Sequence, residues 1–281
     1  MTILSYNLCI EAGQNLIWNK SAKEDQHVAF LRDAQAVILP QVCSEKLYAL
    51  SSKNCSSVFP NYHARFHYPG KTGQAKLFQK FAVPHPQTCV YKDLKEWVAK
   101  GGKELCTFPS VFKLSWGGEG SNVALLQTKT DLNHWLKKAA TSEKNGQKGF
   151  LIQQYIPTGG KSLRVVVIGE RYYSYWRIAP DNNEEGQQDI AERFYSNLAK
   201  GAEIDRNFMP ERQDAAVQAL RSFCQQTHIN LAGVDFIFSE KETEPEPLFL
   251  EINYCFRCKG LGGHDKYVGH LTEAIREWLR G

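Results

Sequence analysis

Three short apolar segments, separated only by short turns, constrain the fold of this chain more than any other feature of its sequence. Residues 150–156, 163–169 and 172–178 are rich in aliphatic and aromatic side chains, and turn residues at 159–160 and 169–170 separate them. Runs of this length and composition favour strands, and connections this short favour antiparallel pairing. We therefore expect antiparallel sheet in the second half of the chain.

The same patterns predict strands and helices along much of the remaining sequence. Apolar runs predict strands at 36–39, 111–114, 123–126, 233–238 and 248–252, and helical spacing predicts helices at 76–81, 130–136, 210–224 and 268–279. On a strand, the alternating residues His63, Arg65 and His67 would share one face, either as a site for an acidic substrate group or as a solvated edge. Because helices and strands are mixed without an internal repeat, the sequence predicts the α+β class with antiparallel sheets.

Proline, glycine and polar stretches divide the chain into three expected lobes. The boundary between the first two lies near Tyr68-Pro69-Gly70, and a polar run at 141–148 ends the second. We expect a short N-terminal α/β lobe at 1–68, a small lobe at 69–150 and a C-terminal lobe at 151–281. The polar segment 181–192 is expected to be a mobile loop.

Composition excludes several classes of protein. The 34 Lys and Arg residues exceed the 30 Asp and Glu residues by only 34 − 30 = 4, which argues against a nucleic-acid partner. The sequence has neither an apolar run of the roughly 18 residues that a membrane span needs nor an export signal at its N-terminus. Eight cysteines scattered through a chain of this length favour reduced thiols and a cytoplasmic location.

The turn Gly117-Gly118-Glu119-Gly120 is the first candidate for chemistry, because glycines let backbone N–H groups approach an anion closely. Lys113 lies four residues earlier between apolar neighbours, where an unpaired charge is costly. Together the two features favour phosphate binding. The alternatives are an ordinary hairpin turn and a lysine whose buried stem carries its amine to solvent.

A second candidate lies on the two expected strands nearest the C-terminus. Glu251 and Asn253 point to the same face, and Asp235 joins them if the two strands pair. Two carboxylates and an amide oxygen are hard ligands, suited to Mg²⁺ that carries nucleotide phosphates. The alternative is a pair of acids that end strands and bond to the backbone.

In combination these segments resemble the ATP-grasp superfamily, and most closely its RimK-type carboxylate–amine ligases. The similarity covers about residues 68–279 and rests on the following ordered segments: Lys71, Lys113 with the glycine turn, 153–156, 163–169, 196–198, 233–235 and 251–253. It implies two α+β lobes that hold a nucleotide between them and a glycine loop that closes over the phosphates.

The resemblance also implies roles for individual residues. Arg164 and Lys113 would be catalytic, with Arg164 facing the transferred phosphate. Contacts to ATP would come from the following residues: Lys71, Lys113, Gly117, Gly118, Gly120, Ser121, Gln153, Gln154, Tyr155, Ile156, Ser162 and Asn197. Asp235, Glu251 and Asn253 would hold two Mg²⁺ ions, or Mn²⁺ in their place.

The sequence departs from the family pattern where the substrate should lie. Residues 254–260 are bulky and basic where the family carries small residues, and Gln154, Ser162 and Tyr195 replace common charged residues. The resemblance therefore implies a ligase for small-molecule or peptide carboxylate and amine substrates, which it leaves unnamed. It also leaves open whether the protein is a homo-oligomer.

Two other hypotheses stay open at this point. An ATP-binding regulatory module without catalysis has little need for both metal carboxylates. A zinc or redox protein would use Cys255 and Cys258, with His264 and His270 downstream, although a zinc site usually needs a second pair of ligands at regular spacing.

Overall fold

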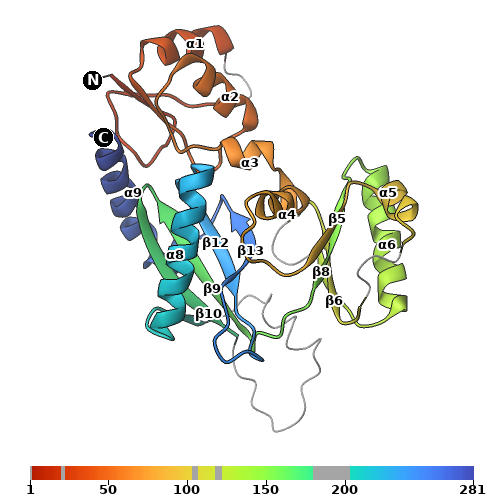
Figure 1. Cartoon of the computed structure of the whole chain (residues 1–281). Helices are drawn as coiled ribbons and strands as arrows, with labels where there is room; N and C mark the ends of the chain where they lie inside the picture. Colours follow the sequence, from red (N-terminus) through yellow and green to blue (C-terminus); the bar gives the residue numbers. More distant parts are fainter. Residues whose placement is uncertain (1, 20–22, 103–106, 118–121, 180–202) are drawn as a thin grey trace.

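The computed structural model describes residues 2–19, 23–102, 107–117, 122–179 and 203–281. It contains a parallel sheet near the N-terminus and two antiparallel sheets, with helices packed on each (Figure 1). The predicted α+β class is confirmed. None of the helices within the described ranges is both long and apolar enough to span a membrane.

The N-terminal lobe is built on four parallel strands in the order β2-β1-β3-β4. Its elements are β1 (Ile3–Ser5), β2 (Gln14–Asn15), α1 (Glu24–Asp33), β3 (Ala36–Ile38), α2 (Glu45–Asn54), β4 (Val58–Phe59) and α3 (His63–His67). The predicted buried strand at 36–39 is confirmed as β3. The segment around Arg65 is not a strand but the short helix α3, in which the rings of His63 and His67 stack at 5.4 Å.

The small lobe is an antiparallel sheet with two helices on one face. Its elements are β5 (Thr88–Tyr91), α5 (Leu94–Ala99), β6 (Ser110–Leu114), β7 (Val123–Leu126), α6 (Lys129–Lys144) and β8 (Phe150–Gln154), with strand order β5-β8-β6-β7. Phe112, Leu114 and Phe150 point towards α6 and form a core with Leu132. Helix α6 begins at Lys129, one residue before the predicted start, because its N-cap is Thr128, which forms a capping box with Asp131.

The C-terminal lobe carries a five-stranded sheet between two helices. Its elements are β9 (Lys161–Ile168), β10 (Arg171–Ile178), β11 (Glu203–Asp205), α8 (Pro210–Thr227), β12 (Leu231–Ile237), β13 (Leu248–Asn253), η1 (Cys258–Leu261) and α9 (His264–Trp278), with strand order β11-β10-β9-β12-β13. The helices α8 and α9 lie on opposite sides of this sheet (Figure 1). Because β13 stands last in the strand order, it is an edge strand among the described strands.

The segment Phe150–Gln154 forms a strand as predicted, but its predicted pairing with the next segment is wrong. Strand β8 pairs with β5 and β6 in the small lobe, whereas β9 and β10 form a hairpin in the C-terminal lobe. The chain thus passes from one sheet to the other between Gln154 and Lys161. Helix α4 (Gly70–Lys80) lies between the lobes and starts earlier than the apolar spacing suggested.

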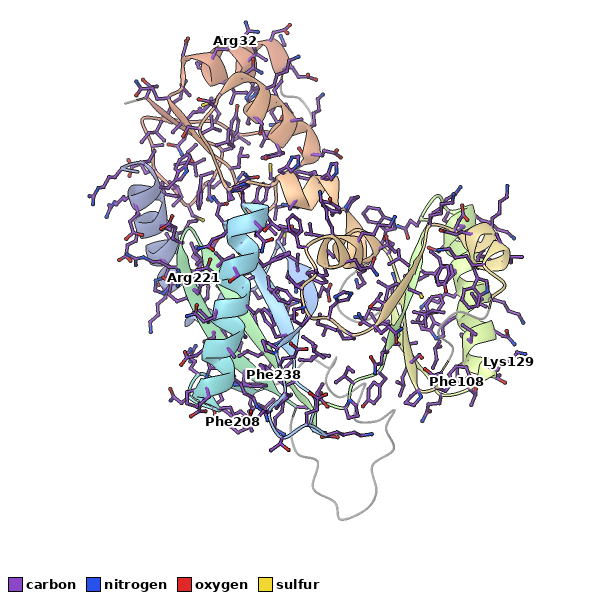
Figure 2. All side chains as sticks on the ribbon, in the orientation of Figure 1. Arg32, Phe108, Lys129, Phe208, Arg221 and Phe238 are labelled. Carbon is purple, nitrogen blue, oxygen red and sulfur yellow. The ribbon has the colours of Figure 1, made fainter. Side chains whose placement is uncertain are left out.

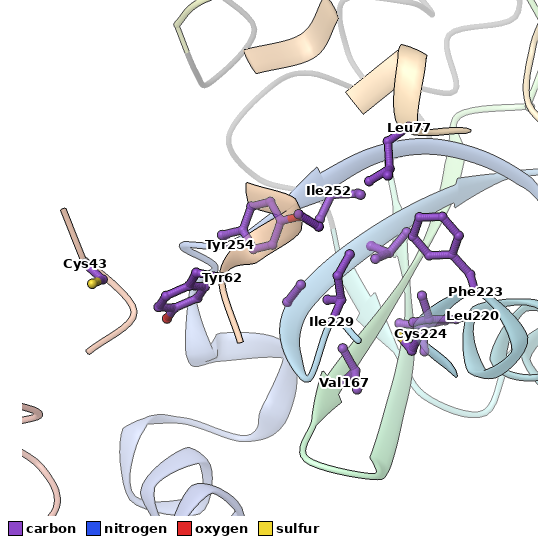
Figure 3. Close-up of a cluster of buried hydrophobic side chains, with 14 of the residues drawn as sticks. Cys43, Tyr62, Leu77, Val167, Leu220, Phe223, Cys224, Ile229, Ile252 and Tyr254 are labelled. Atoms are coloured by element: carbon purple, nitrogen blue, oxygen red, sulfur yellow. The ribbon is translucent and has the colours of Figure 1, made fainter. Parts of the chain in front are cut away.

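Two apolar clusters join the N-terminal and C-terminal lobes. Cys43 and Tyr62 of the first lobe belong to the same buried cluster as Leu77 of α4 and Phe223 of α8 (Figure 3). The small lobe has a separate core beneath α6. Figure 2 shows side chains filling both regions, with Arg221 on the α8 side and Lys129 on the small lobe. Two of the three lobes therefore pack as one unit.

Candidate functional site

A row of polar side chains crosses four strands of the C-terminal sheet on one face. Tyr175 of β10 lies opposite Arg164 of β9, Arg164 opposite Asp235 of β12, and Asp235 opposite Glu251 of β13. Directly opposed residues of antiparallel strands project to the same face. The intervening residues, such as Leu163, point the other way into the core with α8. The pairing register of the four strands thus brings these side chains together on one face of the sheet.

Asp235 is buried at the centre of this row between two arginines. Its Oδ1 and Oδ2 accept from Nε and Nη2 of Arg164 at 2.6 and 2.7 Å, and Nη2 of Arg177 lies 3.0 Å from Oδ2. Asn253 donates its amide to Oδ2 at 3.1 Å. Burial alone would raise the pKa of Asp235, but Arg177 and Arg164 together lower it below its usual value. The carboxylate is therefore charged and fully engaged.

Gly233 gives Arg164 the room to reach this position. A Cβ at Gly233 would lie 3.3 Å from Cδ of Arg164 and 3.4 Å from Cβ of Phe256. Burial by itself would lower the pKa of Arg164, but the neighbouring carboxylate of Asp235 raises the pKa above its usual value. The guanidinium is a permanent cation on this face.

Glu251 meets two lysines that come from other parts of the chain. Nζ of Lys71, on α4, lies 3.7 Å from Oε1 of Glu251 and donates to the carbonyl of Gly117 at 2.7 Å. Lys113, on β6, is only 8 % exposed. Burial lowers the pKa of Lys113 to about 8, while Glu251 acts in the opposite direction. The carboxylate of Glu251 and the amines of Lys71 and Lys113 thus lie close together where the small lobe meets the C-terminal lobe.

A pocket lies between the small-lobe sheet, α4 and β13. The residues that line it are Lys71, Gln74, Ala75, Phe78, His85, Thr88, Lys113, Leu151, Gln153, Leu250 and Glu251. Lys113, Leu151 and Gln153 share the sheet face that points away from α6, because their neighbours Phe112 and Phe150 occupy the other face. The pocket is therefore apolar at Phe78 and Leu250 and charged at Glu251.

The segment that connects the two sheets begins at this pocket. Nε2 of Gln153 donates to Oγ1 of Thr88 at 2.8 Å, and the backbone N–H of Gln154 donates to Gln87. Tyr155 and Ile156 follow directly, outside the strand. Ser162 lies on β9 opposite Arg177, two residues from Arg164. The predicted residues Gly118, Gly120, Ser121 and Asn197, and the loop expected at 181–192, lie outside the described residues.

Arg177 and Gln74 are the site residues that sequence patterns missed. Arg177 was detectable in principle, because a tight hairpin after Ile168 places it opposite Ser162 and hence on the face of Arg164. Its Nε is buried without a hydrogen-bond partner. Gln74 gave no signal, since a glutamine in a helix is ordinarily a solvated side chain.

The donor set on β12 and β13 fits a hard divalent cation only in part. Glu251 and Asn253 offer a carboxylate and an amide oxygen, the ligand types that such cations prefer. Asp235 has both oxygens occupied by guanidinium groups. Within the described ranges, no three His, Cys, Asp or Glu side chains are grouped as metal ligands. Glu251 and Asn253 are therefore more available than Asp235 as ligands for a cation.

The Cys255 and Cys258 pair makes no such group either. Sγ of Cys255 donates to the carbonyl of Gln41 at 3.3 Å, and Cys258 begins the short helix η1. His264 contacts a different thiol, that of Cys9, at 3.8 Å. These contacts give the zinc hypothesis no support.

Comparisons with known proteins agree with this architecture. The chain matches a RimK domain ATP-grasp protein from Sphaerobacter thermophilus over 98 % of its own length and 99 % of the other's, with 13 % identity and a TM-score of 0.61. It matches D-alanine–D-alanine ligase from Bacillus anthracis, solved with ATP, over 95 and 87 % with 13 % identity and a TM-score of 0.62. For the macrocyclase MdnC of Microcystis aeruginosa, bound to its precursor peptide, the values are 98 and 79 %, 15 % and 0.55.

At these identities the structural matches show the fold. No protein with curated function matches the sequence. The sequence model of the RimK-like ATP-grasp domain, however, matches residues 70–274, which contain the polar row, the pocket and both lysines. The chain therefore belongs to the RimK-like ATP-grasp domain family.

Proposed function

We propose that this protein is an ATP- and Mg²⁺-dependent ligase that joins a carboxylate to an amine through an acyl phosphate and releases ADP and phosphate. The observation that carries the proposal is the meeting of Lys71, Lys113 and Glu251 at one pocket. These residues come from α4, β6 and β13, so folding has gathered two cations and one anion at the junction of two lobes. An anionic substrate with a bound cation fits this arrangement.

The nucleotide is proposed to lie between the small-lobe sheet and β13. Backbone groups of residues 153–156 would contact the adenine, with Leu250 and Phe78 as apolar surroundings. Lys71 and Lys113 would contact the phosphates from one side. We also propose contacts from Gly117, Gly118, Gly120, Ser121, Ser162 and Asn197, which lie within the range matched to the family.

Arg164 is proposed to stabilise the transferred phosphate and the acyl phosphate. Its guanidinium is held by Asp235 in a fixed orientation, and a fixed cation costs no reorganisation when charge develops. A carboxylate is a poor electrophile, and its phosphorylation creates a good leaving group for attack by an amine. Because positioning and charge stabilisation supply most of this catalysis, we assign no nucleophilic side chain.

Glu251 and Asn253 are proposed to hold Mg²⁺, whereas the oxygens of Asp235 are occupied by Arg164 and Arg177. When bound, the ion neutralises phosphate charge and orients the phosphoryl group. The substrates are proposed to be small-molecule or peptide carboxylates and amines, as for the ligase and macrocyclase relatives. We propose that the protein acts in the cytoplasm.

Phosphate release tests this proposal. Purified protein with Mg²⁺ and ATP is assayed across a panel of amino acids and peptides, supplied singly and in pairs. We expect phosphate release that depends on one carboxylate and one amine, and a new amide product by mass spectrometry. Glu251→Gln should lower the rate by about a hundredfold or more, whereas Glu277→Gln, which alters an exposed pair with Arg171, should not.

The outcomes separate the ligase from the regulatory module. Binding of ATP without turnover on any pair of substrates would favour the module that binds nucleotide without catalysis. Absence of nucleotide binding would contradict both hypotheses.

A further inference from the structure

The strand that carries Glu251 and Asn253 lies at the edge of its sheet. Among the strands that the structure describes, β13 pairs with β12 alone. On the other side its backbone groups need partners from elsewhere, and edge strands without partners open readily. The position of two proposed cation ligands thus depends on whatever covers this edge.

Gln74 of α4 supplies two of those partners. Its Nε2 donates to the carbonyl of Ile252 at 2.8 Å, and its Oε1 accepts from the N–H of the same residue at 2.9 Å. The carboxamide therefore replaces a peptide group of an absent neighbouring strand. Farther along the edge, the N–H of Phe249 donates to the carbonyl of Pro84 at 2.8 Å.

These two bonds hold the residue between the two cation ligands. Ile252 is flanked by Glu251 and Asn253, and its own side chain is buried on the opposite face. A shift of its backbone would move both ligands together. Helix α4 is already anchored in the core by Leu77 and Phe78, so packing of the helix does not require a polar group at position 74.

The same helix also contacts the small lobe. The backbone N–H of Lys71 donates to the carbonyl of Ser115 at 2.9 Å, and its Nζ reaches the carbonyl of Gly117. One turn later Gln74 binds β13. Helix α4 thus sets the spacing between a phosphate-binding lysine and the cation ligands.

We propose that Gln74 is a positioning residue, which holds Glu251 and Asn253 in place for a divalent cation by binding the backbone of Ile252. The inference rests on the proposed function, because it assumes that the cation accompanies a nucleotide. It adds to that function a residue of the pocket lining that acts through the backbone of Ile252.

Three variants of the full chain test the role of Gln74. Gln74→Met removes both bonds at similar side-chain size, and Gln74→Glu keeps an acceptor for the Ile252 N–H but loses the donor. Gln79→Met is the matched control, because Gln79 lies on the same helix and donates to the carbonyl of Thr88 instead. Hydrogen exchange of the Ile252 amide is measured first, without nucleotide.

We expect exchange at Ile252 to be about tenfold faster in Gln74→Met and close to wild type in Gln74→Glu and Gln79→Met. The second measurement is the Mg²⁺ concentration that half-saturates binding of a non-hydrolysable ATP analogue, by calorimetry. It should rise about tenfold in Gln74→Met, with affinity at saturating Mg²⁺ within about twofold of wild type.

Unchanged exchange or an unchanged Mg²⁺ requirement in Gln74→Met would overturn the positioning role alone. An equal effect in Gln79→Met would do the same, since it would assign the change to general loosening of α4. Wild-type protein that binds no nucleotide at any Mg²⁺ concentration would overturn the proposed function, and the positioning role with it.

Discussion

Lys113 carries an amine into a strand whose neighbouring side chains are buried. Burial lowers its pKa to about 8, so the free protein holds the amine charged below this pH and loses the charge as the pH rises through it. A phosphate contact needs the charged form. The affinity for nucleotide should therefore fall with rising pH.

We predict that a non-hydrolysable ATP analogue binds more weakly at pH 9 than at pH 7, by up to about tenfold for each unit above pH 8. Lys113→Met should weaken binding at pH 7 by about 1.5–3 kcal/mol and flatten the pH dependence. Calorimetric titration at pH 7, 8 and 9 measures both effects. A slope that survives in Lys113→Met would assign the titration to another group.

Asp235 has a structural role that its sequence context did not reveal. Its removal would leave Arg164, whose side chain is 12 % exposed, without its counter-ion. We predict that Asp235→Asn destabilises the protein by about 3 kcal/mol, the cost typical of a broken buried pair. Urea unfolding measures the change.

Glu277→Gln is the control for this prediction, because it removes a carboxylate from an exposed arginine pair with Arg171. Its unfolding midpoint should stay at the wild-type value. Wild-type stability in Asp235→Asn would mean that solvent, and not Asp235, compensates the two guanidinium groups.

Sequence reasoning found the charged residues that stand out against apolar neighbours and missed those that do not. Lys113 and Asp235 were predicted as site residues because burying them without a partner is costly. Arg177 lies near the end of the mostly aromatic strand β10, and only the strand pairing places it beside Asp235. The burial of a charge can be inferred from local sequence, but its partner depends on register.

At the scale of elements, the short helix η1 packs directly against the polar row. A Cβ at Gly260 would lie 2.0 Å from Cζ of Tyr175, and Tyr175 is the neighbour of Arg164. An added methyl group would therefore displace either the ring of Tyr175 or the backbone of η1. Gly260 therefore allows η1 to approach the sheet.

We predict that Gly260→Ala destabilises the protein by about 1–3 kcal/mol through overpacking. Gly269→Ala provides the contrast, since its Cβ would meet no atom within 4 Å in the exposed part of α9. It should stabilise the protein by about 0.5–1 kcal/mol through helix propensity. Thermal unfolding of the two variants gives shifts of opposite sign; shifts of the same sign would contradict the packing argument.

The type of most elements could be predicted from periodicity, whereas their partners could not. The segment 150–154 has the composition of a strand in any sheet, and only the fold assigns β8 to the small lobe. The segment around Arg65 is too short for helical and strand spacing to differ clearly, and α3 spans only 5 residues. Short segments are decided by the contacts they enter.

At the scale of the whole molecule, the buried clusters differ in what they join. The N-terminal and C-terminal lobes share two clusters, while the small lobe has its own and connects to the rest of the chain through residues 81–87 and 155–160. A lobe with its own core, joined to the rest by two chain segments and a few hydrogen bonds to α4, can rotate as a unit. A nucleotide between Lys113 and Glu251 would draw the lobes together.

We predict that the radius of gyration in solution decreases when Mg²⁺ and a non-hydrolysable ATP analogue are added together. Small-angle scattering measures the change. Lys113→Met, at the same nucleotide concentration, should show a smaller decrease because one of the bridging contacts is lost. Identical curves with and without nucleotide in the wild type would mean that the lobes are already closed.

The pairing of Thr88 with Gln153 has a consequence for how this protein can be recombined. Because these residues are strand partners, and Gln154 bonds to Gln87, the small lobe leaves and rejoins the rest of the chain at a single place. A segment whose ends meet can be exchanged without lengthening any connection. We therefore expect that the small lobe can be exchanged between relatives as a unit. Outside the exchanged segment, only the side chains of α4 that contact the small lobe would have to match it.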